Sequence, residues 1–242
     1  MRKHIFWLPI LFFSFALGLG AYFIYYLNQA PEIAEPGPVQ EEFDCIKPNN
    51  FPGRSQRISE LTWRKNEYFP KGAFDDGWEN NDDSANKWYG RYLRTMKEAS
   101  LLNTPDENYE EYRFLWLRTF DHPVAVRIER EGRYSFRIVS EELDGRGGYD
   151  PGKILRTDNL TISREEWCEF ISLLEQARFW TEPTDIDRGG NDGAQWILEG
   201  VKSNRYHIVD RWSPENGNFR EACIYLLKLS GRDIGKLGTE LY

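Results

Sequence analysis

The residues best suited to chemistry lie on a predicted strand at 205–212. Because side chains alternate along a strand, one face carries Tyr206, Ile208, Asp210 and Trp212. An aspartate on an apolar face is costly unless it is paired, and Arg118 on another aromatic-rich strand is a suitable partner. Two interpretations stay open: an Asp–Arg tie that fixes strand register, or a pocket for a small anionic or polar ligand. The candidate ligand-binding residues of this pocket are Arg118, Gln195, His207, Asp210 and Arg211.

A second candidate site is a weak calcium loop. Asp185, Asp187 and Asp192 place carboxylates as at the start of such a loop, with a glycine at the sixth position. The twelfth position, which should be a bidentate glutamate, is Trp196. A solvated acidic loop is therefore the simpler interpretation, and we expect no metal site.

Catalytic motifs do not emerge from the remaining sequence. His207 and Asp210 lie three apart on a strand, so they point to opposite faces and form no local acid–base pair. The run from Gly147 to Lys153 matches a phosphate loop, but Ile154 stands where the magnesium-binding hydroxyl belongs. A glycine-rich turn explains this run better. We expect no cofactor and favour a binding protein over an enzyme.

The elements that position these residues are predicted in the order helix, three or four strands, helix, two strands, helix. Apolar spacing predicts a helix over 84–101 and a strand around Phe114–Phe120 that is buried on both faces. A hairpin turning at Glu131-Gly132 follows, with Arg127, Arg133 and Arg137 on its outer face. We expect this face to be a solvated lattice of salt bridges; a site for an anion or a partner is the alternative. Further strands are expected at 152–158, 195–200 and 205–212. Helices begin at the capping box Ser163–Glu166 and near Asn218. This order predicts an α+β domain, a mainly antiparallel sheet with helices packed on one face.

The N-terminal part predicts a membrane anchor. Residues 5–27 are uncharged and apolar, long enough as a helix to cross a bilayer. Arg2 and Lys3 precede them, which favours a cytoplasmic N-terminus. We expect a transmembrane signal-anchor at 1–28, a Pro-rich tether at 29–56 and a single α+β domain at 57–242. A cleaved signal peptide, ending near Gly18, is the alternative.

Charge and cysteine content narrow the location and the partners. The chain carries 31 basic and 39 acidic residues; without Arg2 and Lys3, 29 basic residues face 39 acidic ones, a net charge of −10. An acidic surface repels phosphate backbones, so we expect no nucleic-acid partner. Of the three cysteines, Cys168 and Cys223 either pair across neighbouring helices or stay free.

Several motifs together resemble a group of uncharacterised bacterial proteins that are often exported or membrane-anchored. These motifs are Trp88–Arg94, Tyr112–Phe120, Leu143–Tyr149, Asp192–Gly200 and Tyr206–Pro214. The resemblance covers roughly residues 84–230 and implies a bacterial envelope location. It implies no activity.

We therefore expect a single-pass protein of the bacterial inner membrane whose C-terminal domain lies in the periplasm and binds an envelope protein. An envelope immunity or inhibitor protein that neutralises a basic toxin is one alternative. An unrecognised enzyme with a small polar pocket is the other.

Overall fold

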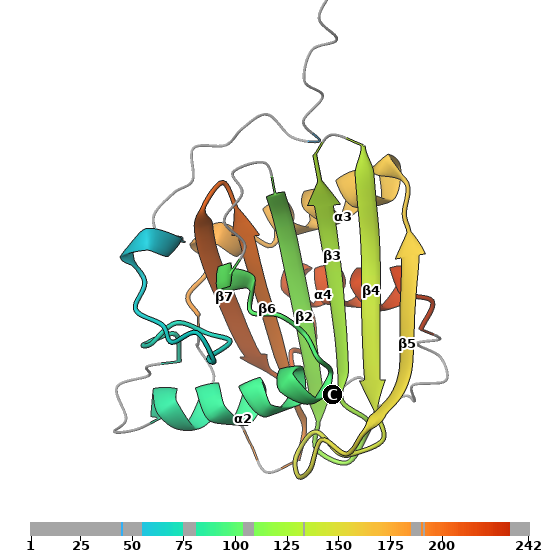
Figure 1. Ribbon diagram of the computed structural model, residues 1–242. Coiled ribbons are helices and arrows are strands. Elements are labelled where there is room, and N and C mark those ends of the chain that lie inside the picture. The colour runs from blue at the N-terminus through green and yellow to red at the C-terminus, as the bar shows by residue number, and fades with distance from the viewer. Residues whose placement is uncertain are drawn as a thin grey trace, which may run out of the picture. The chain divides into compact units, whose positions relative to one another are not determined.

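The computed structural model describes Cys45 and residues 55–74, 81–103, 109–132, 134–184, 190 and 192–232 (Figure 1). Residues Asp44–Tyr242 form one compact unit. The predicted anchor at 1–28 and most of the predicted tether at 29–56 lie outside the described residues. Among the described helices, none has the length and apolar character needed to cross a bilayer.

A seven-stranded antiparallel sheet forms the centre of the larger unit. Its spatial order is β1-β7-β6-β2-β3-β4-β5, and every neighbouring pair is antiparallel. The strands are β1 (Gln56–Arg57), β2 (Tyr109–Arg118), β3 (Val124–Glu131), β4 (Ser135–Leu143), β5 (Ile154–Thr161), β6 (Ala194–Lys202) and β7 (Arg205–Trp212). The prediction of an α+β fold with an antiparallel sheet is confirmed; the short β1 had not been predicted.

Helices cover both faces of the sheet, so the prediction of helices on one face is wrong. In Figure 1, α3 (Arg164–Gln176) and α4 (Asn218–Leu229) lie behind the sheet, and α2 (Asn81–Thr95) lies in front. Central strand β2 explains this arrangement, because its alternate side chains face two different cores. Tyr112, Phe114 and Trp116 belong to the core under α3 and α4, whereas Leu115 and Leu117 belong to the core under α2.

Local signals set the ends of the helices as the sequence indicates. Ser163 and Glu166 form the predicted capping box at the start of α3. Helix α4 is followed by Gly231 in the left-handed conformation, at φ 73°. Helix α2 ends earlier than predicted, because Lys97 also adopts a left-handed conformation, at φ 62°, and the Glu98 N–H donates back to the Leu93 carbonyl at 3.0 Å.

The glycine-rich run after β4 is a turn between strands, as predicted. It packs against the end of β2 so closely that a Cβ at Gly147 would lie 2.4 Å from the backbone oxygen of Arg118. The Tyr92 hydroxyl on α2 donates to the Gly147 carbonyl at 2.8 Å. The run therefore connects β4, β2 and α2 and has no phosphate-loop geometry.

Candidate functional site

The five residues predicted to bind a ligand separate onto the two faces of the sheet. Arg118, His207 and Arg211 lie on the α3/α4 face. The Arg118 guanidinium stacks over Trp116 at 4.2 Å, and the His207 ring packs edge-on against Phe179 at 5.2 Å between ring centroids. Arg211 donates to the carbonyls of Pro183 and Thr184, at 2.9 and 2.8 Å.

The other two residues, Gln195 and Asp210, lie on the α2 face. The side-chain amide of Gln195 donates to one carboxylate oxygen of Asp210, and the Tyr89 hydroxyl of α2 donates to the other at 3.1 Å. Asp210 is therefore paired on its apolar face, as the sequence demands, but by an amide and a phenol. The predicted tie to Arg118 does not form, because a whole sheet layer separates the two side chains.

The calcium candidates gain no support from the structure. Asp185 and Asp187 lie outside the described residues, and Asp192 is exposed in a loop. Within the described part of the chain, no group of three or more His, Cys, Asp or Glu side chains is arranged to hold a metal ion.

A cluster of charged side chains on the α2 face of β2, β3, β4 and β6 stands out instead. We call it the Glu98 cluster; its members are Glu98, Glu111, Arg113, Arg127, Glu129, Arg137, Glu141 and Glu199. The turn at Lys97 that ends α2 directs Glu98 onto the sheet. Because charged side chains rarely leave water unless they are paired, this grouping on a sheet face requires explanation.

Arg113 is the fully buried centre of this cluster. Its guanidinium donates to Glu199 Oε1 from Nε at 2.9 Å and from Nη2 at 2.5 Å. From Nη1 it donates to Glu98 Oε2 at 3.0 Å and to the Ala99 carbonyl at 2.5 Å. Two carboxylates and a carbonyl therefore satisfy this buried cation.

Arg127 extends the network toward the edge of the sheet. It donates to Glu98 Oε2 at 2.9 Å and to Glu111 Oε1 at 3.3 Å, and it also contacts Glu129, which pairs with Arg137. The hairpin face therefore carries the expected ion pairs, and Arg137 is exposed as predicted, but Arg127 is only partly exposed and Glu129 is buried. Only 3% of the surface of Glu129 is exposed. Arg133 lies outside the described residues.

Burial and charge act on the carboxyl groups of the cluster in opposite directions. Burial alone would raise the pKa of Glu98, but Arg113 and Arg127 hold that pKa below its ordinary value. Burial raises the pKa of Glu111 to about 7, with only partial compensation from Arg127. Burial and the charge of Glu98 raise the pKa of Glu141 to about 8. Within the described residues, Glu141 Oε2 has no hydrogen-bond partner, although the residue is only 7% exposed.

A groove of about 420 Å³ opens beside the cluster, at the end of α2. We call it the α2-end groove; it is lined by Lys65, Asn66, Glu67, Tyr68, Arg94, Glu98, Ala99, Ser100 and Asn103. The Tyr68 hydroxyl donates to the Glu98 carbonyl at 3.1 Å, and the Tyr68 ring lies 5.8 Å from the Arg113 guanidinium. Tyr68 is thus shared between the open groove and the buried network.

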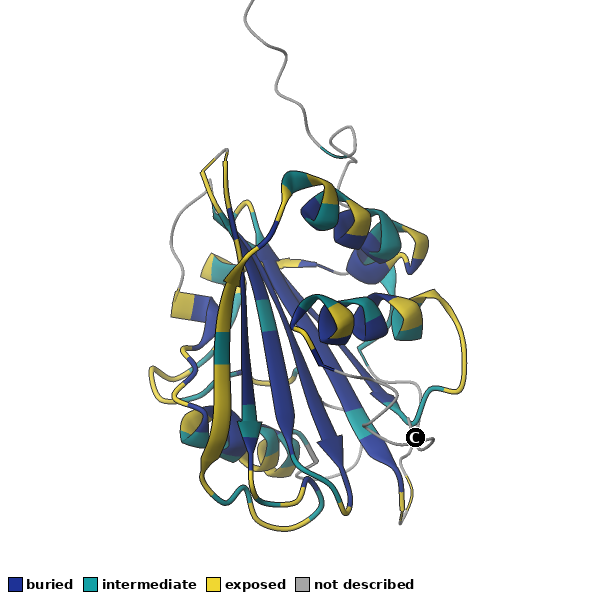
Figure 2. Ribbon diagram, turned by 90° about the vertical axis from the view of Figure 1, so that its right-hand side faces the viewer, coloured by how far each residue is buried: buried dark blue, intermediate teal, exposed yellow. Residues whose placement is uncertain are grey.

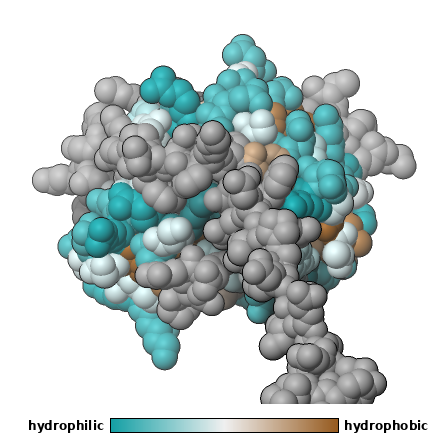
Figure 3. Space-filling model, turned by 90° about the horizontal axis from the view of Figure 1, so that it is seen from above, coloured by the Kyte–Doolittle hydropathy of each residue, from teal (hydrophilic) through white to brown (hydrophobic). Residues whose placement is uncertain are grey.

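The lining of the groove is polar and carries both signs of charge. Lys65 and Arg94 are exposed at its rim, and Arg94 donates to the Asn66 carbonyl at 3.3 Å. Seen from above, the coloured surface of the molecule is also mostly hydrophilic, with small separate apolar areas (Figure 3). The groove can therefore hold a polar group through hydrogen bonds, whereas an apolar ligand would find few partners there.

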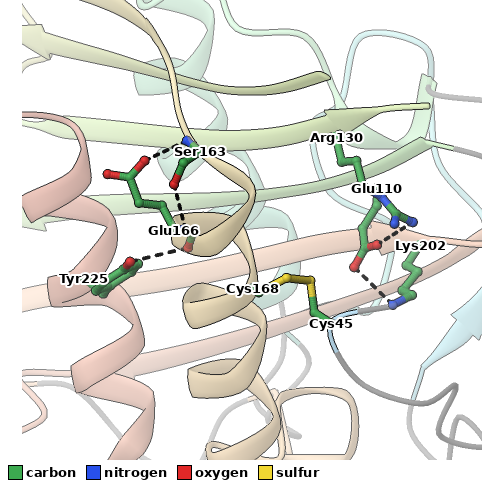
Figure 4. The surroundings of a disulfide bond; sticks show 8 residues. All are labelled: Cys45, Glu110, Arg130, Ser163, Glu166, Cys168, Lys202 and Tyr225. Carbon is green, nitrogen blue, oxygen red and sulfur yellow. Dashed lines mark hydrogen bonds and ion pairs between the residues drawn. A yellow bond between two sulfur atoms is a disulfide. The ribbon is translucent and has the colours of Figure 1, made fainter. Parts of the chain in front are cut away.

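A disulfide bond lies on the opposite side of the sheet. Cys45 is bonded to Cys168 of α3, with their Cα atoms 5.0 Å apart (Figure 4). Of the two alternatives, the pairing of Cys168 with Cys223 is therefore wrong, and the prediction of free cysteines holds for Cys223 but not for Cys168. Cys223 is free and fully buried in the α3/α4 core, and burial raises the pKa of its thiol. Beside the disulfide in Figure 4, the Glu110 carboxylate forms ion pairs with Arg130 Nη2 at 3.1 Å and with Lys202 Nζ at 3.2 Å.

The Glu98 cluster and the disulfide bond were both missed from the sequence, for different reasons. The Glu98 cluster was missed because Glu98 had been placed within a longer helix. A usable signal did exist: Arg113 directly precedes the strand around Phe114–Phe120 that is predicted to be buried on both faces, and an arginine that extends such a strand requires a buried carboxylate. The disulfide was missed because Cys45 lies in a Pro-rich segment without periodicity.

No family model matches this sequence, and no curated protein matches it either.

Proposed function

We propose that this chain is an anchored protein of the bacterial envelope whose folded unit lies in the periplasm and binds a protein partner. The resemblance to exported and anchored bacterial proteins supports this proposal, as does the uncharged run at 5–27. The partner binds through the α2-end groove, and no catalysis is assigned to the chain.

The observation that carries the proposal is the bond between Cys45 and Cys168. Structural disulfides persist in oxidising compartments such as the periplasm and are rare in the cytosol. Cys45 lies directly after the larger part of the predicted tether, so the segment that would leave the membrane is covalently attached to α3. An outward-facing folded unit explains both the bond and its position.

The groove supports the binding role. Its volume of about 420 Å³ lies within the ordinary range for ligand sites. Its lining is polar and carries both basic and acidic side chains, which suits a polar segment of a protein. The exposed Lys65 and Arg94 at the rim do not favour capture of a basic toxin, which would need an acidic surface. The distribution of Arg118, His207 and Asp210 over two faces does not favour an enzyme built on those residues.

Topology and thiol state can be tested together in cells that make the full chain. We expect protease added to spheroplasts to digest residues 44–242, and a mass-tagged maleimide to find one free thiol, Cys223, after denaturation. A Cys45→Ser variant should show two free thiols. Protection of the folded unit in intact spheroplasts, or three free thiols in the native chain, would contradict the proposed location.

The groove is tested separately by photocrosslinking. A photoreactive amino acid at Asn66, an exposed groove residue, should give one defined adduct in the envelope, and Arg94→Glu should remove it. The matched control is the same amino acid at Tyr134, which is 78% exposed on the β3–β4 turn. Equal adducts from both positions would exclude the groove as the binding site while leaving the topology unaffected.

A further inference from the structure

Among the described strands, β5 is a terminal strand of the sheet and is unpaired on its outer side. It pairs with β4 alone, and no other described strand lies beyond it. Figure 2 looks toward this edge and shows β5 exposed over most of its length. Its apolar side chains Ile154, Leu155 and Leu160 are 37%, 55% and 44% exposed. An open edge presents backbone donors and acceptors that a further strand can pair with.

The sequence of β5 is complementary to itself when the strand is reversed. Two copies related by a twofold axis perpendicular to the sheet form an antiparallel pair centred on one residue. With Thr157 at the centre, Arg156 faces Asp158 of the second copy, twice. Threonine opposite threonine and opposite charges across a strand pair are both favourable.

The neighbouring registers are unfavourable for the same reason. A centre at Asp158 would place two carboxylates opposite each other, and a centre at Arg156 would place two guanidinium groups opposite each other. Centres nearer the ends shorten the overlap. Charges on edge strands often prevent pairing. Among these three registers, only the one centred on Thr157 places each charged side chain opposite a charge of the other sign.

We propose that β5 pairs with β5 of a second copy of this chain, antiparallel and centred on Thr157, so that the two sheets become one. Existing contacts hold Arg156 and Asp158 in place for this role. Arg156 Nε lies 2.6 Å from Asp158 Oδ2 along the strand, and Arg232 lies 3.8 Å from the same oxygen.

Site-directed crosslinking of the full chain in detergent tests this register. A Thr157→Cys variant places the introduced thiols next to each other across the axis, where a disulfide forms readily. We expect mild oxidation to give about tenfold more covalent dimer than Tyr134→Cys, a more exposed site that reports random collision. The native cysteines do not interfere, since two are bonded and Cys223 is buried.

Two further variants exclude other occupants of the edge. Thr157→Lys places like charges at the axis and should leave the full chain monomeric by light scattering, with an unchanged circular dichroism spectrum. Deleting residues 233–242 should not change the yield of the Thr157→Cys dimer. Equal yields from Thr157→Cys and Tyr134→Cys would overturn the proposal. A dimer that forms only after the deletion would show that this chain's own C-terminal segment covers the edge.

Discussion

On one face of strand β2, Phe114 and Trp116 pack against Trp196 and are fully buried in an apolar core. On the other face, Arg113 is equally buried but is held by two glutamates. The apolar face gains stability from the area removed from water and tolerates modest changes of shape. The charged face depends on complete pairing, because each buried charge is costly once its partner is removed. One sheet thus contains a robust side and a side that responds to the charge state of a few residues.

The largest expected effect comes from removing the central cation. Arg113→Met leaves Glu98 and Glu199 buried without their shared partner, so we expect the free energy of unfolding to fall by about 3–5 kcal/mol. Val126→Ala, on the apolar face, should cost about 2 kcal/mol through lost contacts and a small cavity. Urea unfolding followed by tryptophan fluorescence measures both.

A compensating variant separates lost pairing from lost packing. Replacing Glu98 and Glu199 by methionine together with Arg113→Met removes the buried charges as a set, and most of the lost stability should return. If the triple variant is no more stable than Arg113→Met, the network contributes through shape and the contrast between the faces disappears.

An intermediate effect is expected from pH. Glu111 and Glu141 have pKa values of about 7 and about 8, both above the value of 4.5 for an ordinary glutamate. The folded state therefore binds protons that the unfolded state has released, so stability should fall as pH rises from about 5 to about 8. The pKa of Glu98 is lowered, so this residue is already ionised and adds no slope there.

A single variant tests this slope. Glu141→Gln removes the larger pKa shift, and we expect it to be about 2 kcal/mol more stable than the native chain at pH 8.5 and nearly equal to it at pH 5. Thermal unfolding across this range is the measurement. A native stability that is flat or rises between pH 5 and 8 would show that the cluster is not strained by its excess of carboxylates.

The smallest effect concerns the turn that directs Glu98 into the cluster. Lys97 has φ 62°, a conformation that glycine adopts without cost. Lys97→Gly should raise the free energy of unfolding by about 0.5 kcal/mol or slightly more. Thr95→Gly, at the last residue of α2, should instead lower it by about 0.5–1 kcal/mol. A loss of stability in both variants would show that Lys97 makes a contact worth more than its backbone strain.

The layered arrangement could be predicted only in part from the sequence. The strands, the helices and their order could be predicted because they depend on local patterns, such as the alternation along β2 and β3 and the capping box of α3. The face on which α2 packs depends on the whole sheet, since β2 offers apolar side chains in both directions. The pairing of Asp210 was predicted in principle, but its partners Tyr89 and Gln195 come from separate elements. The groove arises from 57–74 meeting the end of α2, and no short-range pattern encodes that meeting.

The covalent link between Cys45 and α3 has a mechanical consequence. A pull transmitted along the backbone from the N-terminal side reaches α3 through the sulfur bridge before it reaches β1, a strand of only two residues. The force then acts on α3, a helix of thirteen residues that packs on the aromatic core. It does not act on β1, where it would separate this edge strand from β7 and open the sheet. Reducing the bridge would transfer the same force to the weakest ladder of the fold.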